Sequence, residues 1–244
     1  MRGVLALARL WRVLSCIVAG WATLRWRFPH MSLAQREDAI QVWASRMLQA
    51  FGIGLQVQGQ PLQPGPVLWV ANHVSWLDIL TLHAMRHCRF VAKAEVHHWP
   101  LIGAMAAAAG TLFIERQSSR DAMRVVHQMA QALQDGDVLA VFPEGTTSDG
   151  ETLLPFHANL LQAAVVTQTP VQPLLLRYTE CDSGRRATSV CYIDDQTLLG
   201  SVWRTLTAPP VQVTVQVGVC QQAEERNRRQ WAHDLRQAML GMGQ

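Results

Sequence analysis

The sequence is poor in charge and has almost no lysine. Only 16% of its 244 residues are Asp, Glu, Lys or Arg, against about 25% in an average globular domain. Lys93 is the single lysine among 21 lysine and arginine residues. Hydrophobic residues make up 49% of the chain, which excludes a disordered or low-complexity protein. The net charge of +3 excludes a nucleic-acid-binding protein unless that charge is clustered.

Paired cysteines are also absent. The chain has five cysteines, an odd number, and none of them forms a C-x-x-C motif. This pattern argues against a disulfide framework and against a cysteine zinc site, and it favours a reducing compartment. A chain of this length buries enough apolar surface to fold without such crosslinks.

The N-terminal stretch lacks acidic residues, since none precedes Glu37. It contains three of the nine tryptophans of the chain. On a helical wheel, one narrow stripe holds Arg2, Arg9, Arg12, Thr23 and Arg27. An apolar helix with a cationic stripe and tryptophans is typical of a helix that lies in the membrane surface. Clustered arginines also favour anionic lipid headgroups.

Two other interpretations of this helix stay open. The first is a helix packed on the core of the protein itself. The second is a spanning or cleaved segment, which the sequence disfavours. The uncharged run 13–24 would extend roughly 18 Å as a helix, well short of a hydrocarbon core of about 30 Å. No A-x-A cleavage site follows the apolar run.

Short apolar runs alternate with amphipathic segments along the rest of the chain. The expected strands are residues 55–57, 67–70, 89–92, 111–114, 138–142, 171–176, 189–193 and 211–219. The expected helices are residues 33–50, opened by a Ser32/Gln35 capping box, and 99–109, 120–133, 158–166 and 224–240. We therefore predict a layered α/β domain over residues 51–244, with a mostly parallel sheet flanked by helices. Residues 1–50 are predicted to form a membrane-interfacial amphipathic helical arm.

Residues 72–78 (Asn-His-Val-Ser-Trp-Leu-Asp) follow the strand 67–70, and strand ends are where α/β folds bind ligands. His73 is expected in the loop and Asp78 in the first turn of the next helix. An Asp that accepts from one imidazole nitrogen leaves the other nitrogen free as a general base for an acceptor hydroxyl. The alternative is that Asp78 caps a helix and His73 is an ordinary loop residue. Ser75 lacks the glycine-flanked elbow of serine nucleophiles.

Three further segments place polar groups at strand ends. Residues 111–116 end a strand with Arg116, and residues 142–146 (Phe-Pro-Glu-Gly-Thr) end another with Glu144. Residues 170–173 open a third strand. If the sheet is parallel, His73, Arg116 and Glu144 emerge at its carboxyl edge and can converge. Each segment alone could also be a surface turn or a solvated strand end.

These four segments resemble the four sequence blocks of the glycerolipid acyltransferases, a family that includes the 1-acylglycerol-3-phosphate acyltransferases. The blocks are N-H-x4-D, F-x-x-R, F-P-E-G-T and a proline-rich apolar segment, and this chain carries them in that order between residues 67 and 176. The resemblance implies transfer of an acyl chain from coenzyme A or acyl-carrier protein to the hydroxyl of a lysolipid. It implies His73 as the base and Asp78 as its partner. The acceptor-binding residues are then expected to be Phe113, Arg116, Glu144, Gly145 and Thr146.

The same resemblance implies that no bound cofactor or metal is needed, because the thioester is a co-substrate. The expected partners are the lipids of an anionic inner leaflet and the acyl donor, with no nucleic acid. We expect the protein on the cytoplasmic face of the inner membrane, as a monotopic or peripheral protein. The His97–His98 pair is then a surface feature and not a metal site.

The chain departs from the family pattern at two positions that face an acceptor phosphate. Thr147 stands where the commoner pattern has Arg, and His157 stands where it has Lys. A charged contact to phosphate is about twice as strong as a neutral hydrogen bond. Either Arg116 and Lys93 suffice for 1-acylglycerol-3-phosphate, or the acceptor lacks a phosphomonoester, as lyso-ornithine lipid does.

Lys93 ends the expected strand 89–92 in a chain that otherwise uses arginine. A compact ammonium at that position is suited to a headgroup or to the phosphates of the coenzyme. The alternative is that the lone lysine is chance. Two other classes of function also remain: a membrane-surface lipid hydrolase or thioesterase that uses the same dyad with water, and a lipid-binding module without catalysis.

Overall fold

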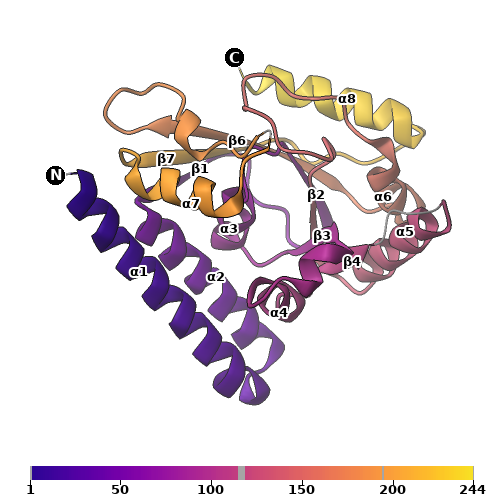
Figure 1. Ribbon diagram of the computed structural model, residues 1–244. Coiled ribbons are helices and arrows are strands. Elements are labelled where there is room, and N and C mark those ends of the chain that lie inside the picture. Colours follow the sequence, from indigo (N-terminus) through magenta and orange to yellow (C-terminus); the bar gives the residue numbers. More distant parts are fainter. Residues whose placement is uncertain (1, 115–118, 194, 244) are drawn as a thin grey trace.

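A seven-stranded sheet runs through the centre of the computed structural model, which describes residues 2–114, 119–193 and 195–243 (Figure 1). Its strands lie in the order β1-β7-β6-β2-β5-β3-β4. All neighbouring strands are parallel except β6 and β7, which are antiparallel. The prediction of a mostly parallel sheet is confirmed. In chain order the strands are β1 (Ile53–Gly59), β2 (Val67–Ala71), β3 (Arg89–Lys93), β4 (Leu112–Ile114), β5 (Val138–Val141), β6 (Val171–Glu180) and β7 (Val211–Val217).

Helices cover both faces of the sheet, because consecutive residues of each buried strand point to opposite faces. Val67, Trp69 and Ala71 of β2 join one hydrophobic cluster with α2, α3 and α7. Leu68 and Val70 join a second cluster with α5, α6 and α8. The helices are α1 (Arg2–Ala22), α2 (Leu33–Phe51), α3 (Leu77–Met85), α4 (Ile102–Ala108), α5 (Ser119–Gln134), α6 (Gln162–Thr167), α7 (Leu198–Thr207) and α8 (Arg228–Gly241).

The predicted boundaries of α2 are confirmed. Ser32 accepts a hydrogen bond from the Gln35 backbone and the Gln35 side chain accepts one from the Ser32 backbone, which is the predicted capping box. Gly52 ends the helix with φ +79°, a conformation that glycine adopts without strain. Met47, Leu48 and Phe51 are buried, so the C-terminal half of α2 is part of the core.

Helix α1 lies along α2 and also contacts α7 (Figure 1). The indole nitrogen of Trp43 donates to the carbonyl of Cys16 at 2.9 Å, and Trp43 packs so close to Gly20 that a Cβ there would come within 2.4 Å of its Nε1. Arg9 is 4% exposed and donates to the carbonyls of Leu206 and Ala208 at 3.1 and 2.6 Å. A cation suits this position, because the C-terminal end of α7 carries partial negative charge.

The position of Arg9 therefore corrects the prediction that this residue belongs to a cationic stripe facing the membrane. Arg9 holds α1 onto the domain and does not face outward, whereas Arg12, Arg25 and Arg27 are exposed. The exposed stripe of α1 is apolar instead: Val4, Leu7, Trp11, Leu14 and Val18 are all between 47% and 74% exposed. By length and composition alone, Gly3–His30 is long and apolar enough to cross a membrane.

The C-terminal third differs most from the prediction. Residues 189–193 do not form a strand, and a 3-10 helix at Thr188–Val190 is found there. Helix α7 was not predicted, although Thr197 is a regular N-cap whose hydroxyl accepts from the Gly200 backbone.

Helix α4 begins at Ile102, three residues later than predicted, because Leu101 has φ +64° and cannot be part of a right-handed helix.

Candidate active site

The loop after β2 is fixed to β6 through Asn72. Its side-chain amide donates to the Leu176 carbonyl at 3.1 Å, and its side-chain oxygen accepts from the Leu176 backbone at 2.7 Å. Asn72 is 2% exposed, so both bonds are shielded from water. A side chain that pairs with a strand backbone in this way fixes where the next residue, His73, leaves the sheet.

The carboxylate of Asp78 is fully buried and accepts four hydrogen bonds. Oδ2 accepts from His73 Nδ1 at 2.8 Å and from the backbone of Val74 and Ser75 at 2.7 and 2.9 Å. Oδ1 accepts from the Tyr178 hydroxyl at 2.7 Å. Such a set of donors compensates for the loss of water around a buried carboxylate.

The imidazole of His73 is held on two sides. Asp78 accepts from Nδ1, and the ring of Phe142 stacks on it with centroids 4.0 Å apart and planes 11° apart. The side chain is 19% exposed. With the Nδ1 proton directed at the carboxylate, the Nε2 lone pair is free to accept a proton. The structure therefore brings the two residues of the predicted dyad together, and the His73 side chain stays partly exposed.

Glu144 joins the end of β5 to the same loop. Its Oε1 accepts from the His73 backbone at 2.9 Å and its Oε2 from the Leu154 backbone at 3.0 Å. The residue is 3% exposed. Burial raises the pKa of Glu144 above its ordinary value, and the two backbone hydrogen bonds oppose that rise. His73 and Glu144 thus converge at the carboxyl edge of the sheet, and the carboxylate uses both oxygens on the protein backbone.

Replacing Glu144 with glutamine is expected to lower the free energy of unfolding by about 1–3 kcal/mol, because one backbone N–H would face an amide donor. Displacement of His73 should also reduce kcat by roughly tenfold to hundredfold. Thermal unfolding and steady-state kinetics check this, with Glu151→Gln at an exposed carboxylate as control. A raised acceptor KM at unchanged stability would instead assign Glu144 to direct acceptor binding.

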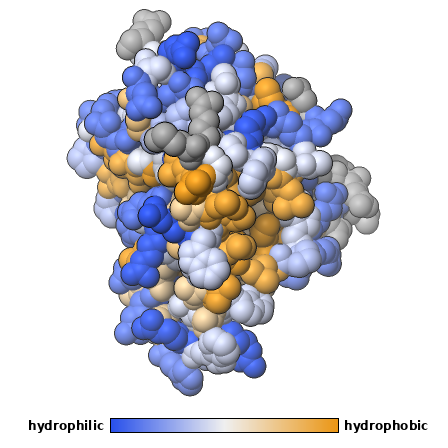
Figure 2. Space-filling view, turned by 60° about the vertical axis from the view of Figure 1, so that its left-hand side comes forward, coloured by the Kyte–Doolittle hydropathy of each residue, from blue (hydrophilic) through white to orange (hydrophobic). Residues whose placement is uncertain are grey.

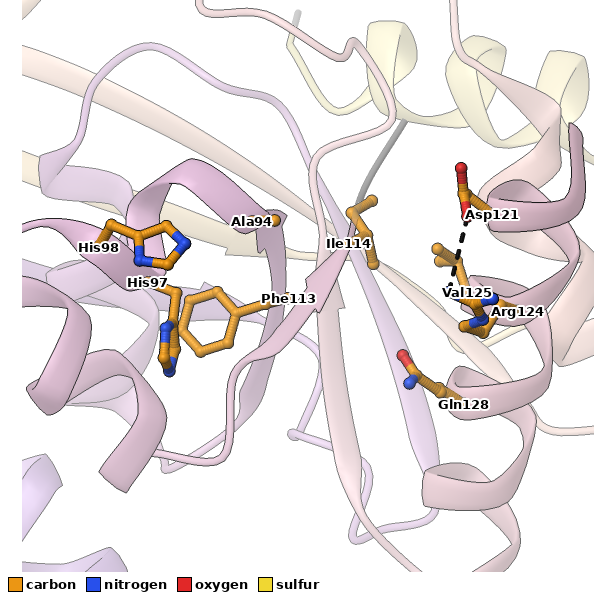
Figure 3. A pocket seen from close by; sticks show the side chains of 9 residues that line it. All are labelled: Ala94, His97, His98, Phe113, Ile114, Asp121, Arg124, Val125 and Gln128. Carbon is orange, nitrogen blue, oxygen red and sulfur yellow. Dashed lines mark ion pairs between the residues drawn. The ribbon is translucent and has the colours of Figure 1, made fainter. Parts of the chain in front are cut away.

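A cleft of about 300 Å³ opens further along the same edge, between the 3-10 helix Ala94–His98, β4 and α5 (Figure 3). Phe113 forms part of its wall and packs edge-on against His97 at 4.8 Å. Arg124 and Asp121 form an ion pair on the opposite side at 3.6 Å. Three strand spacings of about 4.8 Å separate β4 from β2, so the cleft lies roughly 14 Å from the end of β2.

Comparison with known proteins decides which family has this arrangement. A family model described as Acyltransferase matches residues 54–177. A lyso-ornithine lipid O-acyltransferase of Pseudomonas aeruginosa is 36% identical over 224 residues, which cover 91% of this chain and 85% of that protein. The chain belongs to the acyltransferase family.

Two further relatives agree with this assignment. A 1-acyl-sn-glycerol-3-phosphate acyltransferase of Neisseria meningitidis is 39% identical over 195 residues, or 79% of this chain and 76% of that protein. The crystal structure of the LPA acyltransferase PlsC from Thermotoga maritima superposes with a TM-score of 0.70 and 20% identity, covering 100% of this chain and 97% of that one. That structure supports the fold.

The structure describes all but one of the remaining predicted site residues of the acyltransferase. Lys93 is the exposed last residue of β3 and pairs in register with Ile114 of β4. Thr146 is exposed beside Glu144. Gly145 has φ +72°, and a Cβ there would come within 2.8 Å of the His157 ring, so this turn admits only glycine without strain. Arg116 lies outside the described residues.

The structure places a partner beside each of the two positions that depart from the family pattern. The Thr147 hydroxyl donates to the Tyr192 carbonyl, and His157 packs on Gly145. In the described part of the chain, no group of three or more His, Cys, Asp or Glu side chains is placed to hold a metal ion.

Sequence reasoning missed two residues of the site. Phe142 was predicted as a strand end and as the first residue of the F-P-E-G-T block, without the role that its ring has in stacking on His73. Tyr178 lies on β6 beyond the predicted strand end at residue 176 and reaches Asp78 across the fold. The one available signal was rarity, since Tyr178 is one of only two tyrosines in the chain.

Proposed function

We propose that this acyltransferase moves a fatty acyl chain from the thioester of coenzyme A or acyl-carrier protein to the free hydroxyl of 1-acylglycerol-3-phosphate, giving phosphatidic acid. The observation that carries the proposal is the His73–Asp78 pair, with Nδ1 and Oδ2 2.8 Å apart and the His73 side chain 19% exposed. A histidine oriented by a buried carboxylate is suited to take a proton from a hydroxyl.

The reaction is a direct attack. His73 Nε2 accepts the hydroxyl proton as the acceptor oxygen forms a bond to the thioester carbonyl carbon. The tetrahedral intermediate then collapses, the carbon–sulfur bond breaks, and the thiolate leaves with the proton that His73 had taken. The charge on Asp78 stabilises the imidazolium between these two steps.

The acceptor phosphate needs cations, and two basic residues, Lys93 and Arg116, come at or just after strand ends in the sequence. Lys93 is exposed at the end of β3, the strand beside β5, which leads to Glu144. Arg116 follows β4 by two positions in the sequence. We assign the phosphate to these two residues, and we assign Phe113 and Thr146 to the rest of the acceptor.

A second candidate acceptor is lyso-ornithine lipid. It is favoured by Thr147 and His157, which remove two cations from the wall beside Gly145. The relative from Pseudomonas aeruginosa carries that activity in its name, and the relative from Neisseria meningitidis carries the other. Their identities to this chain are similar, so the acceptor has to be tested directly.

The test offers the purified protein labelled acyl-CoA or acyl-carrier protein with lysophosphatidic acid, with lyso-ornithine lipid, or with neither. We expect transfer to lysophosphatidic acid at least tenfold faster than to lyso-ornithine lipid. Lys93→Ala should raise the KM for lysophosphatidic acid about tenfold, through the loss of one charged contact. An unchanged KM would remove Lys93 from the site.

Two outcomes would overturn the proposed reaction. Transfer to lyso-ornithine lipid alone would establish the second acceptor. Cleavage of the thioester at the same rate without any acceptor would establish a hydrolase, the rival from another class.

We further propose that the arm docks the domain on an anionic lipid surface, at the cytoplasmic face of the inner membrane, where its lipid substrates lie. Figure 2 shows hydrophobic side chains gathered along one face of the molecule with hydrophilic residues around them. The apolar stripe of α1, with Trp11 at its centre, is 47–74% exposed, while Arg9 holds the opposite side of the helix on the domain. An apolar stripe flanked by exposed arginines fits an interfacial helix.

Co-sedimentation with vesicles of phosphatidylglycerol checks the docking. Trp11→Glu is expected to weaken binding about tenfold or more, because a charge replaces an inserted aromatic ring. Met123→Glu serves as the matched control, since Met123 on α5 is 75% exposed and Trp11 is 73% exposed. A wild-type protein that remains in the supernatant at low salt, or equal losses in both variants, would contradict the proposal.

A further inference from the structure

We infer that Tyr178 is a positioning residue of the dyad, whose hydroxyl holds Oδ1 of Asp78 so that Oδ2 stays directed at His73. The inference rests on the proposed function, since it assigns a role within the same catalytic pair. Tyr178 lies on β6, a strand that carries none of the polar motif residues, and its side chain reaches Asp78 on the first turn of α3.

The geometry fixes the direction of the Tyr178 proton. The hydroxyl oxygen lies 2.7 Å from Asp78 Oδ1 and 3.2 Å from the Thr81 hydroxyl. Thr81 in turn lies 2.9 Å from the carbonyl of Leu77, which accepts its proton. A carboxylate is the stronger acceptor and the shorter contact, so the single Tyr178 proton points at Asp78.

The distribution of donors over the carboxylate is uneven. His73, Val74 and Ser75 all donate to Oδ2. Among the described residues, Tyr178 is the one donor recorded for Oδ1. Rotation of the carboxylate about its Cβ–Cγ bond would break the Tyr178 contact as well as the others. The tyrosine therefore restricts the plane in which Oδ2 meets the imidazole.

Burial supports a permanent donor at this position. Tyr178 is 4% exposed. Burial raises the pKa of its hydroxyl well above the ordinary value, and the negative charge of Asp78 adds to the rise. The phenol therefore stays protonated over the whole range in which the enzyme can work, and it donates in every protonation state of His73.

A purely structural role would also place a tyrosine here, so the test must separate the two. Tyr178→Phe keeps the ring and removes the donor. We expect kcat to fall about tenfold or more, in line with loss of a hydrogen bond to a charged group, with both KM values unchanged within twofold. Tyr192→Phe, the same change at the only other tyrosine, is the matched control and should keep wild-type kcat.

The pH profile gives a second readout that a structural role would not move. Without the Tyr178 donor, the negative charge of Asp78 is less satisfied and binds the His73 imidazolium more tightly. The acidic limb of the kcat/KM profile should then move to higher pH. A Tyr178→Phe protein with a lower melting temperature but unchanged kcat and pH profile would overturn the inference.

A double-mutant cycle completes the experiment. If Tyr178 acts through Asp78, adding Tyr178→Phe to Asp78→Ala, which leaves no group for the hydroxyl to hold, should cost no further activity. A tenfold loss in both backgrounds would show that the hydroxyl acts elsewhere and overturn the inference.

His73→Ala separates this result from the proposed function. Full activity in that variant would refute the dyad mechanism itself, whereas an inactive His73→Ala beside an unaffected Tyr178→Phe would refute the positioning role alone.

Discussion

Replacing His73 with alanine is expected to lower kcat by about a thousandfold or more while the protein stays folded. A buried carboxylate holds Nδ1 of the ring, which leaves Nε2 as the base, and the side chain is 19% exposed. General-base catalysis contributes about 10²–10⁴-fold. The same imidazolium also protonates the leaving thiolate, so one substitution removes help from both halves of the reaction.

The matched control is His127→Ala, the same change at an exposed histidine of α5. It should keep kcat and both KM values within twofold of the wild type. Circular dichroism and thermal unfolding establish that His73→Ala is folded, which is expected because the ring is partly exposed and the neighbouring loop is held by Asn72 and Glu144. Retention of more than a tenth of the wild-type kcat would contradict the proposed mechanism.

The sheet and the dyad could be predicted because both depend on local sequence. Apolar runs such as residues 138–142 alternate with amphipathic helices, and this pattern predicts a parallel sheet whatever the distant contacts are. His73 and Asp78 are five positions apart, so a strand end and one helical turn suffice to bring them together. The convergence of His73 and Glu144 followed from the parallel order of β2 and β5.

The contacts that hold the dyad could not be predicted, because they join residues far apart in the chain. Tyr178 lies 100 positions from Asp78, and Glu144 lies 71 positions from His73. The motif gave Glu144 a role in binding the acceptor, and only coordinates reveal that both of its oxygens accept from backbone N–H groups. Residue type alone does not say whether a carboxylate faces a substrate or its own protein.

The arm shows the same limit in a different way. A helical wheel groups Arg9 with the other arginines of the arm, and the structure buries Arg9 against the end of α7. The apolar face of an amphipathic helix can pack against lipid or against protein, and a helical wheel does not distinguish the two. In α1, Arg9 and apolar residues such as Val13 face the domain, and a second set of apolar residues, centred on Trp11, faces outward.

Replacing Asp78 with asparagine is expected to lower kcat by about 10³–10⁴-fold with a much smaller effect on stability. The amide oxygen can take the place of Oδ2 and keep the backbone bonds from Val74 and Ser75. The amide nitrogen then faces the Tyr178 oxygen, which can turn its proton towards Thr81 and accept. The geometry therefore survives, and the negative charge that stabilises the imidazolium is lost.

Kinetics at several pH values, together with thermal unfolding, separate these two effects. Asp137→Asn is the matched control, because it removes a carboxylate that is paired with Arg89 and should leave kcat within about threefold of the wild type. A large drop in melting temperature for Asp78→Asn would mean that Asp78 acts by holding the loop together. If kcat stayed within tenfold of the wild type, the charge of Asp78 would not be needed for catalysis. His73 would then act as the base without electrostatic help from Asp78.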